Sequence, residues 1–462
     1  MSWLTRLPAL SSCSKTMFLS ARAELDKLLG MLFYSTECDG IGGVLRERLE
    51  DFVVVELALG KVPCTPGCSK SLSSGSGNYL WLLVEKRGID TVTALRALAR
   101  AMGVDRRSLS VAGLKDARAV AFQLVCAEGL EPEKVPSRVG NKLLVHEAFR
   151  MPFKLTSGML YGNFFSINVR GLEVQLEEAA RRIAQILKEM GEVGGAPNYY
   201  GYQRFGTIRP ITHIVGRYIL LGQFEEAVRE LLTRVFPLES PRAREFRTYL
   251  ASTWDLEGAL KLAPRRLHHE RIVLEHLVKR PKDYAGALRK LPLAVRSLFV
   301  EAYQAYLFNL VLSGRMEEGL PLSSPVPGDL VALRANGFQV LRCRDGNLDK
   351  VRELIAKGKA GVVGNVFGYA TVLAEGVPGA IERQVLAEEG VSLDLFRVKS
   401  MPEAATKGTV RPLALNPESL SWYCGKNDGA YINFSFTLRK GMFATVLLRE
   451  FVKPKDPALQ GF

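Results

Sequence analysis

The stretch AGLKDARAVAFQ, residues 112–123, sets one carboxylate between two segments with strand character. The segments SLSVAG (108–113) and RAVAFQLVC (118–126) are rich in small and β-branched apolar residues, as strands are. We therefore expect Asp116 in a tight connection between two strands, with basic residues close to it on either side. Aspartate is common in turns for structural reasons, so this stretch alone favours a turn or capping carboxylate over a catalytic one.

Strand and helix patterns continue on both sides of this stretch. Asp90 or Thr91 is placed to cap a helix. The apolar face expected for that helix consists of Val92, Leu95, Ala99 and Met102. Further segments have the patterns of strands at 51–56, 79–87, 163–170 and 430–440, and of helices at 172–190 and 442–451. This mixture of elements predicts an α+β fold.

The length of the chain indicates more than one domain. A chain of 462 residues is longer than one hydrophobic core usually organises. Past Pro210 the sequence changes to helices rich in Leu, Arg and Glu, followed by a segment with many Pro and Gly residues. We interpret residues 211–407 as an inserted domain, and residues 24–210 together with 408–462 as the domain that it interrupts. Residues 1–23 are expected to form a poorly ordered N-terminal extension.

The charge balance favours a polyanionic partner. Lys and Arg number 62 against 48 Asp and Glu, which gives a formal charge of +14 and a pI near 9.4. The seven cysteines form no CxxC pair and the five histidines lack metalloprotease spacing, so no metal site is predicted and a reducing compartment is expected. No apolar run is long enough to cross a membrane. These features predict a cytoplasmic protein without a membrane partner.

A second stretch, PNYYGYQRFG (197–206), sets aromatic residues and an arginine between glycines. Such side chains can stack on bases and contact phosphates, yet they also commonly pack a corner of a core. Taken together with the first stretch and three others, it resembles the TruD family of pseudouridine synthases. The stretches that carry the resemblance are GGVLRERLEDFVVVE (42–56), AGLKDARAVAFQ (112–123), GNFFSINVR (162–170), PNYYGYQRFG (197–206) and KGMFATVLLRE (440–450).

The resemblance implies both a fold and an activity. The expected fold is the pseudouridine synthase catalytic fold, with a mixed, largely antiparallel sheet flanked by helices, plus an inserted α/β TRUD domain at 211–407. The expected activity is isomerisation of uridine to pseudouridine in tRNA, without a cofactor or metal. The typical target in the family is the uridine at position thirteen of the D-stem. Other tRNA positions, such as the anticodon, stay open.

Three residues correspond to the family's active site. Asp116 matches the aspartate nucleophile. Phe165 matches the aromatic residue that stacks on the flipped base. Arg46 matches a basic residue that can pair with the aspartate or a nearby phosphate. From the residues alone, Phe165 shares a face with Ile167 and Val169, which favours a core residue, and an arginine in a surface turn is the alternative for Arg46.

Six more residues are placed near the site by the same resemblance, either as active-site support or as RNA contacts. They are Asn163, Lys115, Arg118, Gln203, Arg204 and Phe205. For Lys115, a solvated surface lysine is an equally good interpretation.

A rival function from another class is a non-catalytic RNA-binding or RNA-chaperone protein on the same scaffold. The presence of Asp116, Phe165 and Arg46 favours the enzyme, because a retired enzyme would be free to lose them. DNA is not expected as a partner, since the sequence has no helix-turn-helix or zinc-finger spacing. We expect a monomer that binds tRNA.

Overall fold

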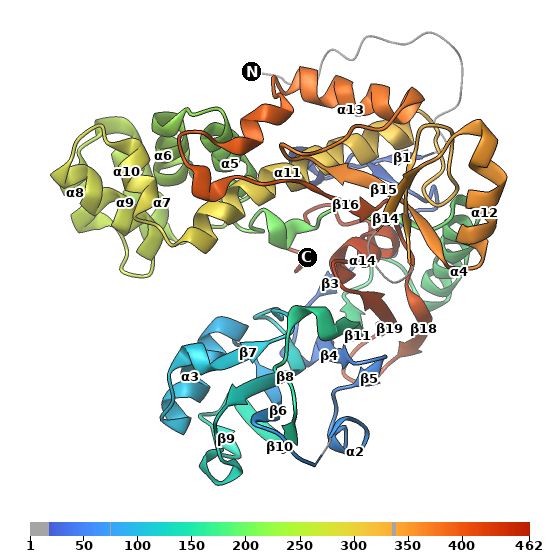
Figure 1. Ribbon diagram of the computed structural model, residues 1–462, viewed down its shortest axis with the longest axis horizontal. Helices are drawn as coiled ribbons and strands as arrows, with labels where there is room; N and C mark the ends of the chain where they lie inside the picture. The colour runs from blue at the N-terminus through green and yellow to red at the C-terminus, as the bar shows by residue number, and fades with distance from the viewer. Residues whose placement is uncertain (1–17, 74, 335–338) are drawn as a thin grey trace.

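The computed structural model describes residues 18–73, 75–334 and 339–462 (Figure 1). Its main feature within these ranges is an 11-stranded sheet in which all neighbours are antiparallel except β4 and β8. From one edge, the strands are β18 (Glu418–Gly425), β19 (Tyr431–Arg439), β11 (Leu160–Arg170), β4 (Phe52–Ala58), β8 (Val120–Glu128), β6 (Tyr79–Arg87), β10 (Leu143–Met151) and β9 (Arg138–Val139). Short strands pair beside this path, namely β3 (Val44–Leu45) with β11, β5 (Val62–Pro63) with β4 and β7 (Leu109–Val111) with β8. The expected mixed, largely antiparallel sheet is confirmed.

One face of the sheet is covered by two separate helical layers. Next to β11 and β19, the central core joins the sheet to α4 (Leu176–Val193), α14 (Ala444–Val452) and part of α11 (Leu293–Glu317). Next to β6 and β10, the same face packs against α3 (Thr91–Met102). The opposite face of β6 packs against α2 (Ser69–Leu72), which explains why β6 is apolar without alternation.

Helix α3 shows both a success and an error of the sequence pattern. Asp90 caps it as expected, because its Oδ1 accepts the Thr93 amide at 2.9 Å. Val92, however, is 40% exposed. The buried face is formed by Ala94, Leu95, Leu98, Ala99 and Met102. The prediction that Val92 belongs to the buried apolar face is therefore wrong.

The inserted region combines helices with a small sheet. Its helices are α5 (Thr212–Leu220), α6 (Phe224–Thr233), α7 (Pro241–Thr253), α8 (Leu256–Leu262), α9 (His268–Lys279), α10 (Tyr284–Arg289), α12 (Leu348–Ala356) and α13 (Gly376–Glu388). Its antiparallel sheet contains β14 (Gln339–Arg342), β13 (Leu330–Leu333), β15 (Ala360–Val366) and β16 (Thr409–Pro412) in that order. We call α6–α10 the helical tip. Figure 1 shows two projections from a central region that holds β11, β19 and α14: one is the helical tip, and the other holds α3, β6, β9 and β10.

Two elements, β16 and α11, do not follow the expected division between the two domains. β16 pairs with β15, with Val363 opposite Pro412, so residues 409–412 belong to the inserted sheet although the boundary was expected at residue 407. Helix α11 belongs to both regions. Ala302, Ala305, Phe308 and Leu312 lie in the central core, whereas Phe299, Tyr303 and Leu307 lie in the core of the insertion.

The N-terminal part of the chain also differs from expectation. The predicted extension lies, for residues 1–17, outside the described residues. Residues 18–23 are ordered, because Phe18 is buried in the central core and Leu19–Ser20 pair with Phe33–Tyr34. The following helix, α1 (Glu24–Leu28), is fixed by a fully buried ion pair in which Arg449 Nε lies 2.7 Å from Asp26 Oδ2.

Candidate active site

Asp116 lies in the connection between β7 and β8, as the sequence predicts. Its carboxylate Oδ2 accepts a hydrogen bond from Arg46 Nη2 at 3.0 Å. The Arg46 side chain is only 6% exposed, whereas that of Asp116 is 39% exposed. The pair therefore joins a buried cation to a carboxylate that a substrate can reach.

Arg46 follows β3 directly and has a left-handed backbone with φ of +58°. Its guanidinium lies 3.9 Å from the centre of the Phe52 ring, on the sheet face that carries the central core. Burial lowers the pKa of Arg46, and the neighbouring Asp116 opposes that shift. The expected pairing of Arg46 with Asp116 is thus present, and the surface-turn interpretation of Arg46 does not fit its burial.

Hydrogen bonds to neighbouring residues hold the backbone of the loop that carries Asp116. Lys86 Nζ donates to the Asp116 carbonyl and, at 2.8 Å, to the Ile89 carbonyl. Burial lowers the pKa of Lys86 to about 8, although Asp116 partly opposes this. The Lys115 amide donates to Thr91 Oγ1 at 2.9 Å. These bonds fix the carboxylate by its main chain and leave its side chain accessible.

Lys115 does not lie where it was expected. Its ammonium group is buried in an ion pair with Glu56, with Nζ and Oε2 2.6 Å apart. Glu56 is itself fully buried and also accepts the Leu124 amide. A buried ammonium of this kind anchors the loop to β4, so neither an RNA contact nor a solvated lysine describes Lys115.

Phe165 lies on the site face of the sheet but is packed from two sides. Its ring stacks on Phe436 with centroids 5.5 Å apart and meets Phe52 edge-on at 6.2 Å. It is 6% exposed and part of the central core. These contacts match the core interpretation, while stacking on a flipped base stays a prediction. Asn163, two residues earlier on β11, has a buried Oδ1 that makes no hydrogen bond to the described residues.

Three more of the side chains expected to contact RNA are Arg118, Gln203 and Arg204. Arg118 is exposed beside the site, and its Nη2 donates to the Arg46 carbonyl at 3.3 Å. Gln203 is exposed as well. Arg204 pairs with Glu301 on α11 at 2.9 Å.

Phe205 is a correction to the expected set of RNA contacts. It is fully buried, with its ring edge-on to His213 at 5.2 Å. It therefore packs the junction of the 197–206 stretch with α5 and cannot contact RNA from this position.

Two residues of the site, Lys86 and Glu56, were not predicted from the sequence. Lys86 and Glu56 occupy otherwise apolar strands, and a charged residue in such a strand is a signal of a buried pair or site.

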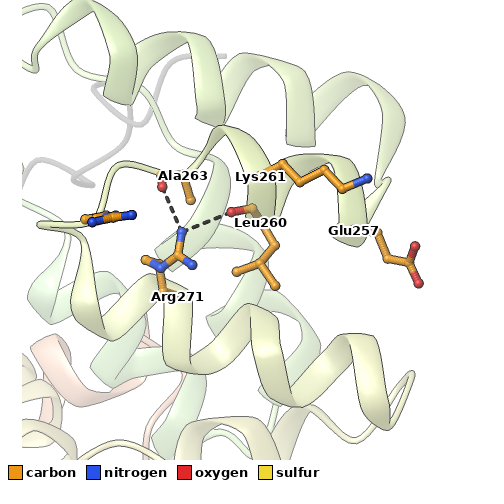
Figure 2. Close-up of a pocket in the computed structure, with 6 residues that line it drawn as sticks. Glu257, Leu260, Lys261, Ala263 and Arg271 are labelled. Atoms are coloured by element: carbon orange, nitrogen blue, oxygen red, sulfur yellow. Dashed lines mark hydrogen bonds between the residues drawn. The ribbon is translucent and has the colours of Figure 1, made fainter.

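A surface hollow in the helical tip shows a structural role for one basic residue, Arg271 (Figure 2). It lies at α8 and α9, in the helical tip, and Arg271 Nη1 donates there to the carbonyls of Leu260 and Ala263 at 3.0 and 2.9 Å. The guanidinium thus caps the C-terminal end of α8.

Over the described ranges, no cluster of three or more His, Cys, Asp or Glu is placed to hold a metal ion. No helix in the described part of the chain is long and apolar enough to cross a membrane.

Comparisons with known proteins agree with this architecture. The family model described as tRNA pseudouridine synthase D (TruD) matches residues 28–451, which include all five stretches of the resemblance. A protein from Methanopyrus kandleri named "Probable tRNA pseudouridine synthase D" is 40% identical over 377 residues, covering 81% of this chain and 86% of its own. One of the same name from Methanococcoides burtonii is 34% identical over 437 residues, covering 93% of this chain and 97% of its own. The crystal structure of a TruD protein from Methanosarcina mazei superposes with a TM-score of 0.78 at 34% identity, covering 94% of this chain and 98% of that one. The chain belongs to the TruD family of tRNA pseudouridine synthases.

Proposed function

We propose that this protein converts a uridine of tRNA to pseudouridine with Asp116 as the nucleophile. The observation that carries the proposal is the pair of Asp116 and Arg46, in which an accessible carboxylate is held by a buried guanidinium at 3.0 Å. A turn-forming aspartate needs no such partner, because its role is fulfilled by local backbone bonds. The isomerisation needs no redox partner, since it only moves the bond to the ribose from one atom of the base to another.

In this reaction the bond between N1 of the base and C1′ of the ribose breaks, and a bond between C5 and C1′ forms. The proton of C5 leaves and N1 takes up a proton, so the composition of the nucleoside does not change. Asp116 supplies the carboxylate that attacks the nucleoside, and Arg46 orients this carboxylate. The target base must leave its helix before Asp116 can reach it.

The tRNA would be bound by exposed basic side chains on the helical tip and beside the site. Exposed Arg or Lys residues on the tip include Arg242, Arg244, Lys261, Arg265, Lys279 and Lys282. Arg118 is the exposed basic residue next to Asp116. We propose the uridine at position thirteen of the D-stem as the target, with a monomer acting in the cytoplasm.

The test is to incubate the protein with unmodified tRNA transcripts and to map pseudouridine by carbodiimide labelling and primer extension. The expected result is one new stop at the target uridine, which disappears in a transcript with cytidine at that position. A stop in the anticodon instead would move the target and keep the reaction. Binding without any stop would favour the rival function, a non-catalytic RNA-binding protein.

A further inference from the structure

The last residues of the chain lie against the active site. After α14, the segment 454–462 returns beside β3, outside the range of the family match. The Leu45 amide donates to the Gln460 carbonyl at 2.8 Å, and Gln460 Nε2 donates to the Gly43 carbonyl at 2.9 Å. The segment is therefore bonded to the residues that lead directly into Arg46.

This segment is also fixed by itself and by the core. The Gln460 amide donates to the Asp456 carbonyl, and the Phe462 amide donates to the Pro457 carbonyl, both at 2.9 Å. The ring of Phe462 is 3% exposed and meets Tyr202 edge-on at 5.9 Å. The segment thus forms a compact turn whose end is buried beneath the 197–206 stretch.

Gly461 makes the contact that matters for the site. Its carbonyl accepts a hydrogen bond from Arg46 Nη1 at 2.5 Å, while Nη2 of the same guanidinium donates to Asp116. Gly461 has φ of +79°, and a Cβ at this position would lie 2.0 Å from the Leu45 carbonyl oxygen. Glycine is therefore required for the carbonyl to come this close.

Two contacts hold the two ends of one guanidinium. Arg46 Nε is buried and makes no hydrogen bond to the described residues, so the orientation of the group rests on its two Nη atoms and on the Phe52 ring. An arginine side chain has many rotamers, and a fixed second contact removes most of them. We propose that Gly461, with Gln460, is a positioning residue for the reaction, because its carbonyl orients Arg46 toward Asp116. This inference rests on the proposed function of Asp116.

The first test compares Gly461→Ala with Leu459→Ala. Leu459 lies on the same segment, but its side chain is 64% exposed, so it serves as the matched control. The measurements are single-turnover pseudouridine formation, tRNA affinity and a thermal melt. We expect Gly461→Ala to slow turnover by about 10- to 100-fold with unchanged tRNA affinity, as small displacements of catalytic groups do. The control should turn over like the wild type.

A second substitution separates positioning from general destabilisation. Arg46→Lys retains a cation that can reach Asp116 but has no second terminal nitrogen for Gly461. In the Arg46→Lys background, Gly461→Ala should therefore cause no further loss of turnover. A full additional loss in that background would show that Gly461 acts independently of Arg46 and would overturn the inference. If Gly461→Ala does not fold, Gln460→Ala takes its place in both backgrounds, since it removes one anchor of the segment without backbone strain.

The inference and the proposed function fail in different ways. Turnover by the wild type that is lost in Asp116→Asn supports the proposed function. If Gly461→Ala then turns over at the wild-type rate, the inference alone is overturned. A folded wild-type protein that forms no pseudouridine in any tRNA would overturn both.

Discussion

Asp116→Asn tests the nucleophile with the smallest possible change in shape. The amide keeps an oxygen that can accept from Arg46, but it is not a nucleophilic carboxylate. If Asp116 is the covalent nucleophile, we expect turnover to fall by on the order of 10⁶-fold, which is below detection. A turn-forming aspartate predicts no effect, because asparagine is equally good in turns.

The effect on stability is expected to be small. A hydrogen bond between charged groups contributes about 1.5–3 kcal/mol, but solvent screening of a carboxylate that is 39% exposed reduces this to about 1 kcal/mol. The side-chain amide of the Asp116→Asn variant would retain a neutral bond to Arg46, so the loss should stay below about 1 kcal/mol and the melting temperature should fall by less than about 4 °C. Binding of tRNA should persist, since one negative charge is removed near the phosphates.

The assay is single-turnover pseudouridine formation at saturating protein, beside a thermal melt and a tRNA binding curve. Asp105→Asn is the matched control. Asp105 also pairs with an arginine at 3.0 Å, but Asp105 and its partner Arg107 both lie at the surface just before β7, near the end of β8 that is remote from Asp116. Substantial turnover by a folded, tRNA-binding Asp116→Asn variant would refute the assignment of Asp116 as nucleophile.

Three further substitutions test other parts of the structure. Phe165→Ala should lower the free energy of unfolding by about 3–5 kcal/mol in a denaturant titration, as for other buried aromatic rings, and a loss below about 1 kcal/mol would show that the ring is not part of the core. Burial lowers the pKa of Lys86 from 10.5 to about 8. Between these two values the unfolded chain binds more protons than the folded protein, so the free energy of unfolding should rise with pH across that window, by at most about 3 kcal/mol. Lys86→Met should abolish this rise, and an identical pH dependence in both proteins would contradict it. Arg265→Ala, on the helical tip, should weaken tRNA binding. If Arg265 contacts one phosphate, the slope of log affinity against log salt should flatten by roughly 0.7 to 0.9, and an unchanged slope would show that Arg265 is not part of the interface.

The strands of the sheet were predictable because burial leaves a local pattern. The apolar run at 79–87 coincides with β6, and the alternating segment 163–170 lies within β11. In both cases the pattern reports which faces are covered, and that information is contained in neighbouring residues. The position of Asp116 between two strands was predictable for the same reason.

The partners of the charged residues were not predictable in this way. Lys115 and Glu56 are 59 residues apart in sequence, and Arg46 and Gly461 are 415 apart. No periodicity links such positions, so a lysine beside the proposed nucleophile fits a surface residue and an RNA contact equally well. The prediction that Phe205 contacts RNA was wrong for a related reason. An aromatic residue in a glycine-rich stretch fits both a corner of the core and a binding surface.

The shared helix α11 changes how the role of the insertion can be tested. Replacing residues 211–407 by a linker would remove the helical tip, but it would also remove Phe308 and Leu312 from the central core. It would also remove Asn309, whose side chain accepts the Tyr200 amide at 2.8 Å and donates to the Leu29 carbonyl at 2.8 Å. The resulting loss of activity would report on the core and not on tRNA binding. Because α11 joins the two cores as one continuous helix, a tRNA held by the tip would be held at a set distance from Asp116, and surface substitutions on the tip are the changes that isolate its contribution.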